Sequence, residues 1–114
     1  MKNKVSFEGI GEVVATFYAG EGVKAGQVVK IGGDSSVAPC AAGECFCGVA
    51  TSVKAGCAGV QVEGFAAVSC GDSSVTVGKV ALAADGNGGV KKAAGGQEYW
   101  VVADDGAGTI TIKM

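Results

Sequence analysis

The chain has 114 residues, of which 48% are apolar, 18% are charged and 21 are glycine, and its net charge is −2. This composition excludes a disordered tail, and glycine without a G-X-Y period excludes collagen. All nine positive charges are lysines and histidine is absent, which disfavours nucleic-acid binding and removes the commonest general base and metal ligand. We therefore expect one domain over residues 1–114 that is not an enzyme and uses no cofactor.

Short apolar runs alternate with glycine-rich turns along the chain, a pattern typical of many short strands. Residues 1–8 are charged and lack the apolar run of a signal peptide, so we expect them to form a flexible N-terminal arm. No window has a helical period, and none approaches the roughly 20 apolar residues of a membrane span. The expected fold is all-β with little or no helix, a small barrel or β-clip-like domain whose strands cover 12–18, 28–31, 46–51, 60–63, 65–68, 75–77, 80–83, 99–103 and 109–113.

Turn signals separate these strands. Gly64 interrupts an alternating run and predicts a bulge or tight hairpin, and residues 85–89 give the strongest hairpin signal in the chain. The segments 32–36 and 71–74 both pair an aspartate with serines, but a serine nucleophile needs a base and histidine is absent. We interpret both segments, and the pair Asp104-Asp105, as turns or loops.

An internal repeat covers approximately residues 20–64 and 72–114. Residues 23–28 resemble 75–80, and the later positions of the two units follow in the same order, with an aromatic residue, then Val-Ala, then an alternating strand (46–50 and 59–62 against 99–103 and 109–112). The period is about 50 residues, at the long end of repeat lengths. One unit has too few strands to be stable alone, so we expect two related halves that close around one core.

The five cysteines, an odd number without a signal peptide, argue against a disulfide framework. A thiolate metal site of Cys40, Cys45 and Cys47, completed by Cys57 or Cys70, is one alternative. Structural zinc favours two CxxC-type knuckles, and the sequence has none. We therefore favour small, buried hydrophobic cysteines and assign no metal site.

Several motifs occur in an order that resembles a known family. They are the segments 23–29, Gly48-Val49-Ala50, 59–65, 77–80 and Asp85-Gly86. Together they resemble the capsid-cement, or head decoration, proteins of tailed bacteriophages and prophages over nearly the whole chain. The resemblance implies a compact, often trimeric β domain that binds the major capsid protein on the outside of the head and reinforces the shell. The five cysteines depart from the family pattern.

This resemblance implies a location on the virion surface after synthesis in the bacterial cytoplasm, with no nucleic-acid or membrane partner. The arm, with Lys4, Val5 and Phe7, is a candidate capsid contact that adds a strand to a capsid edge; a frayed terminus is the alternative. Tyr99 and Trp100 are candidate core or subunit-interface anchors. The alternative function is a small β-barrel accessory or carrier domain of a bacterial enzyme complex, although neither Lys54 nor Lys79 matches a carrier lysine motif.

Overall fold

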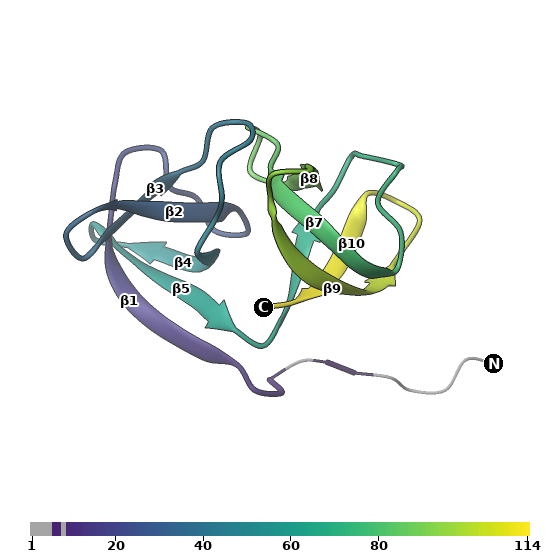
Figure 1. The fold of residues 1–114 in the computed structure, drawn as a ribbon. Coiled ribbons are helices and arrows are strands. Elements are labelled where there is room, and N and C mark those ends of the chain that lie inside the picture. Colours follow the sequence, from purple (N-terminus) through teal and green to yellow (C-terminus); the bar gives the residue numbers. More distant parts are fainter. Residues whose placement is uncertain (1–5, 8) are drawn as a thin grey trace.

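A computed structural model describes residues 6, 7 and 9–114, and they form an all-β molecule with extents of 43 × 30 × 20 Å. The first half is a closed barrel in the strand order β1-β3-β2-β4-β5 (Figure 1). Its strands are β1 (Val13–Ala19), β2 (Val28–Gly33), β3 (Ser36–Pro39), β4 (Gly48–Lys54) and β5 (Cys57–Glu63). The predicted fold class is therefore confirmed.

The second half is a five-stranded open sheet in the order β6-β10-β9-β7-β8. Its strands are β6 (Phe65–Ser69), β7 (Gly78–Ala84), β8 (Val90–Lys92), β9 (Gln97–Asp104) and β10 (Thr109–Lys113). The two halves lie side by side (Figure 1). Gly64 separates β5 from β6 with a positive φ of 100°, and an added Cβ there would lie 2.9 Å from the Glu12 Cα. A glycine is required at this junction for both reasons.

The two halves have the same topology. Read from β1 around the barrel, the order is β1-β5-β4-β2-β3, and the second sheet repeats it as β6-β10-β9-β7-β8 with every pair antiparallel. The sequence correspondences thus have a counterpart in strand order, and the topological units begin earlier than the sequence repeat, at β1 and β6. The halves differ in closure, because β1 pairs with β3 in parallel and no such pair joins β6 to β8 in the described residues.

An aspartate bridges the open seam of the second half. Asp72, just after β6, accepts a hydrogen bond from the Lys92 N–H of β8 at 3.1 Å. The seam is also narrow, since a Cβ added to Gly89 would lie 2.4 Å from the Ser69 carbonyl oxygen. The edges of β6 and β8 therefore approach each other. The Asp72 side chain joins them at the position where β1 and β3 pair directly in the barrel.

The buried side chains form two clusters: the two halves share the larger one, as expected, but the barrel has a second cluster of its own, so the expectation of a single core is wrong. The barrel encloses a small cluster that contains only valine and alanine: Val23, Val29, Val37, Ala50, Ala58 and Val60. The larger cluster lies against the second sheet and includes Leu82, Ile112, Val90 and Tyr99, yet four of its members come from the first half: Val28, Cys40, Phe46 and Val49. The open sheet therefore completes its core with side chains from the barrel half.

Two aromatic residues at matching positions of the repeat meet at this junction. The rings of Phe46 and Tyr99 stack with centroids 5.0 Å apart and an interplanar angle of 9°. Backbone hydrogen bonds add to the contact, because the Gly43 N–H donates to the Ala84 carbonyl and the Ala84 N–H donates to the Glu44 carbonyl. The junction is thus packed and hydrogen-bonded.

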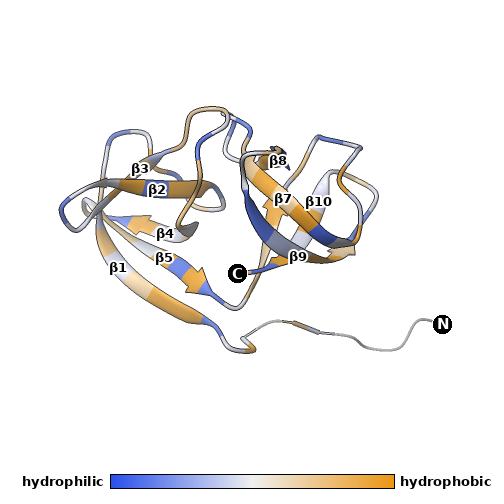
Figure 2. Cartoon of the chain, in the orientation of Figure 1, coloured by the Kyte–Doolittle hydropathy of each residue, from blue (hydrophilic) through white to orange (hydrophobic). Residues whose placement is uncertain are grey.

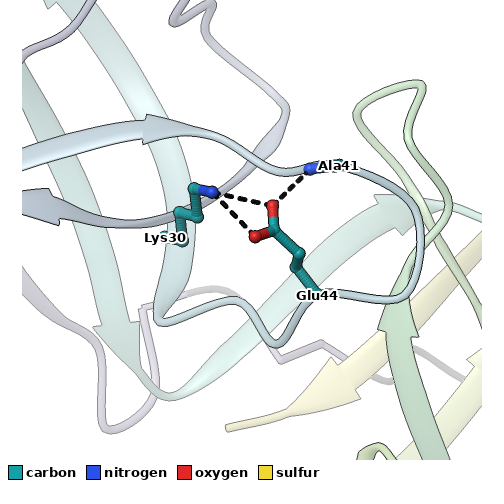
Figure 3. A network of polar contacts seen from close by, with 3 residues as sticks. All are labelled: Lys30, Ala41 and Glu44. Atoms are coloured by element: carbon teal, nitrogen blue, oxygen red, sulfur yellow. Dashed lines mark hydrogen bonds and ion pairs between the residues drawn. The ribbon is translucent and has the colours of Figure 1, made fainter.

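A polar network holds the loop that precedes Phe46 and so positions its ring at the junction. Lys30 of β2 donates to both carboxylate oxygens of Glu44 at 2.8 Å, and the Ala41 N–H donates to Glu44 Oε1 at 2.7 Å (Figure 3). The bond from Lys30, followed by that from Ala41, lowers the pKa of Glu44 below its usual value. The network fixes both ends of the turn from residue 41 to residue 44.

Most predicted strands are present, with three differences. The short strands β3 and β8 were not predicted, because Pro39 and the Lys91-Lys92 pair conceal them. Residues 75–77 lie before β7 and are not a strand, although Val75 is buried.

Mainly hydrophobic strands such as β2 and β7 contrast with the hydrophilic start of β9 (Figure 2). None of the described residues belongs to a helix of a length and hydropathy suited to cross a membrane.

Candidate functional site

The exposed face of the open sheet carries a line of aromatic and cationic side chains. Trp100 of β9 lies opposite Lys79 of β7 on one side and opposite Lys113 of β10 on the other. Lys113 in turn lies opposite Phe65 of β6. Residues directly opposite each other in antiparallel strands project from the same face with Cβ atoms about 5 Å apart. These four side chains therefore cross the sheet from β7 to β6.

Phe7 continues this line beyond the edge of the sheet. Its ring lies against that of Phe65, with centroids 4.9 Å apart and planes tilted by 34°. The described part of the N-terminal segment therefore lies over the end of β6 and not free in solvent. We call the set Phe7, Phe65, Lys113, Trp100 and Lys79 the aromatic–lysine row.

Strand alternation explains why the row is exposed. Along β9, Tyr99 and Val101 are buried while Glu98 and Trp100 are exposed, and along β10 Ile112 is buried while Lys113 is exposed. The inward residues join the larger core cluster. The outward residues are left without cover, and Trp100 keeps 53% of its surface accessible. Trp100 is one of eight large hydrophobic side chains that are exposed among the described residues, and six of them lie in the first half. Its residue type sets it apart, because tryptophan is enriched at the energetic centres of interfaces.

The charge of Lys79 makes only weak contacts within the molecule. The Lys79 Nζ lies 5.9 Å from the centre of the Trp100 ring and 3.6 Å from a Glu98 oxygen. Both partners of that ion pair are more than half exposed, and such surface pairs contribute little to stability. Lys79 is consequently available to a carboxylate of a partner.

The predicted contact residues divide between the two faces of the sheet. Phe7 and Trp100 both belong to the aromatic–lysine row, whereas Tyr99 lies on the opposite, buried face. The core placement is confirmed for Tyr99 and wrong for Trp100, because β9 alternates and is not buried on both faces. Lys4 and Val5 lie outside the described residues.

Sequence reasoning missed Phe65, Lys79 and Lys113 as members of the row. The alternation of Thr109 to Lys113 indicated that Lys113 faces solvent, but nothing in the sequence gave the register that sets it between Phe65 and Trp100. The internal repeat could not supply this pairing, because β1 and β6 lie outside the segments 20–64 and 72–114 that it covers.

The cysteines are dispersed. Cys40 and Cys70 are buried as expected, Cys47 and Cys57 are half-buried, and Cys45 is exposed, so the buried interpretation is wrong for Cys45. Within the part of the chain that the structure describes, no three cysteines or carboxylates form a group able to hold a metal ion. Burial, and secondarily Glu44, raises the pKa of Cys40 to about 11. The thiol thus stays protonated at neutral pH, the opposite of a metal-binding thiolate.

A hollow beside the open seam is lined by Cys70, Asp72 and Asp104. The Asp72 carboxylate already accepts three hydrogen bonds within the fold, from the Ser74 N–H, the Ser74 hydroxyl and the Lys92 N–H. These bonds lower the pKa of Asp72, and burial raises the pKa of Cys70. The turn interpretation of residues 71–74 therefore agrees with this geometry.

Comparisons with known proteins add no assignment to this surface. No model of a protein family matches the chain, and a search of curated proteins found no similar sequence. The aromatic–lysine row is accordingly interpreted from its own chemistry.

Proposed function

We propose that this protein is a head decoration protein of a tailed phage or prophage, which binds the major capsid protein on the outside of the shell and stabilises it. The observation that carries this proposal is the aromatic–lysine row, an uncovered sheet face with an exposed tryptophan on a small all-β molecule. The ordered glycine and valine motifs that resemble capsid-cement proteins support it. In this proposal the protein is not an enzyme and needs no cofactor.

The architecture suits attachment in many copies. Each molecule offers a sheet whose core is completed by side chains of the barrel half, and many modest contacts made at once on an icosahedral shell give strong attachment. We propose a homotrimer, because the resemblance implies three-fold assembly on the head. The protein would be made in the bacterial cytoplasm and retained on the virion.

The test uses heads assembled, without the decoration protein, from the major capsid protein that the phage or prophage genome carrying this gene would encode. The purified protein is added, the heads are sedimented, and the bound copies and the melting temperature of the heads are measured. We expect saturable binding and a higher melting temperature, and native mass spectrometry should give a trimer. An unrelated β protein of equal net charge is the control.

The proposal is contradicted if the protein stays in the supernatant at high concentration. A stable complex with a bacterial enzyme instead of heads would favour the accessory-domain alternative.

A further inference from the structure

We infer that the aromatic–lysine row is the face that contacts the capsid, and that it binds a segment of the shell surface that combines an apolar pocket with carboxylates. This inference rests on the proposed function and assigns its surface and the chemistry of its partner. The open half would bind, while the outer face of the barrel would stay exposed on the decorated head.

The row combines aromatic and positively charged side chains. Phe7, Phe65 and Trp100 are aromatic and the two interleaved members are Lys79 and Lys113. Tryptophan is the residue most enriched at energetic centres of interfaces, where it fills a pocket of the partner. Lys79 and Lys113 lie beside Trp100 and favour negatively charged groups around the partner's pocket, because opposite charges across an interface guide binding.

A second copy related by a two-fold axis would bring the same patch of both copies together. The contact would then hold Lys79, Lys113 and Glu98 from each copy, which is two positive charges against one negative charge on either side. Like charges that face each other across an interface are unfavourable. The row therefore fits a partner of opposite charge better than it fits itself.

Phe7 lies at the β6 end of the row through its contact with Phe65. Residues 1–5 lie outside the described residues, and their sequence contains Lys2 and Lys4 and no acidic residue, so their charge has the same sign as that of the row. A partner that carries carboxylates therefore suits the row better than this segment of the chain does.

The experiment compares three variants of the full chain in the head-binding assay. Trp100→Ser removes the centre of the row, and Lys113→Glu reverses one of its charges. Tyr18→Ser is the matched control, because Tyr18 is the exposed aromatic residue of the barrel strand β1, 65% accessible. Circular dichroism and thermal melting establish that each variant is folded.

We expect Trp100→Ser and Lys113→Glu to weaken head binding at least tenfold, and Tyr18→Ser to change it less than twofold. Added salt should weaken head binding by the wild type more than head binding by Lys113→Glu, because salt screens the charge that this variant has lost. If the wild type binds heads and the row variants bind equally well, or Tyr18→Ser is the weak binder, this inference is wrong while the proposed function stands. If Trp100→Ser loses its oligomeric mass, the row is a subunit interface and the inference is also wrong. If the wild type does not bind heads at all, both proposals fall.

Discussion

The barrel and the open sheet are built from the same strand order, yet they solve the problem of the free edge differently. The barrel closes through the parallel pair of β1 with β3, and the fully buried members of its core are valine and alanine, with Phe17 and Cys47 packed against them. The open sheet has no such pair in the described residues, takes core side chains from the barrel half and leaves an aromatic face exposed. We propose that the first half supports the molecule and that the second half binds its partner.

The largest expected effect is at the junction between the halves. Phe46→Ala removes the ring that stacks on Tyr99 within the larger core cluster, and we expect the free energy of unfolding to fall by about 3–5 kcal/mol. Urea denaturation measures it, and hydrogen exchange should show the greater loss of protection in β7 to β10. A fall below about 1 kcal/mol would mean that the open half does not depend on the barrel half.

Alkaline pH should act at the same junction. Burial raises the pKa of Tyr99 from 10.0 to about 12 and that of Cys40 from 9.0 to about 11. Because the folded state holds both groups protonated, their contribution to stability is complete below pH 9 and is lost as the pH rises to 12. For Tyr99 this loss is about 2 kcal/mol.

The matched variant is Tyr99→Phe, which keeps the ring stack and removes the titrating hydroxyl. Denaturation curves between pH 8 and pH 12 should show a shallower loss of stability for this variant than for the wild type. Identical pH profiles would contradict the assignment of this titration to Tyr99.

A smaller effect, of opposite sign, is expected at the β4–β5 hairpin of the barrel. Ala55 there has a φ of 54° and is followed by Gly56 at 80°, whereas the corresponding loop of the open sheet has glycines at its positive-φ positions, Gly106 and Gly108. Ala55→Asn should raise the free energy of unfolding by about 1 kcal/mol, since asparagine tolerates this conformation. An unchanged or lower stability would show that Ala55 carries no removable strain.

The smallest effect is predicted at the seam. Asp72→Asn weakens the hydrogen bond from the Lys92 N–H, and we expect faster hydrogen exchange at that amide with little change elsewhere. Because bonding lowers the pKa of Asp72, its contribution is present above its ordinary pKa and is lost as the pH falls through the lowered value. Unchanged exchange at Lys92 would show that the seam does not need this side chain.

The sequence predicts the strands well where alternation and glycine turns are clear. The 85–89 hairpin between β7 and β8 and the alternation of residues 109–113 have the structure expected of them. The bulge or tight hairpin predicted at Gly64 is wrong, because Gly64 joins β5 to β6, which belong to different sheets and do not pair with each other. The strands β3 and β8 are too short for a period to be visible. The two core clusters also could not be predicted, because the repeat specifies two similar halves and says nothing about which half lacks the closing pair.

The candidate site was predictable only in part. Phe7 and Trp100 were recognised as contact residues from their type, but their common face depends on the register of four strands. Tyr99 was grouped with Trp100 because residues 99–103 form a continuous apolar run, which hides the alternation of β9. Local composition identifies candidate anchors, whereas the face on which each lies is set by pairings distant in sequence.

The most direct test of the division between a supporting and a binding half is hydroxyl-radical labelling of the wild type, free and bound to heads, read by mass spectrometry. Trp100 is the only tryptophan and Tyr18 is one of two tyrosines, and both are largely exposed in the free molecule. We predict that binding strongly slows labelling of Trp100 and Phe65 and leaves Tyr18 unchanged. Protection of Tyr18 with unchanged labelling of Trp100 would contradict the account.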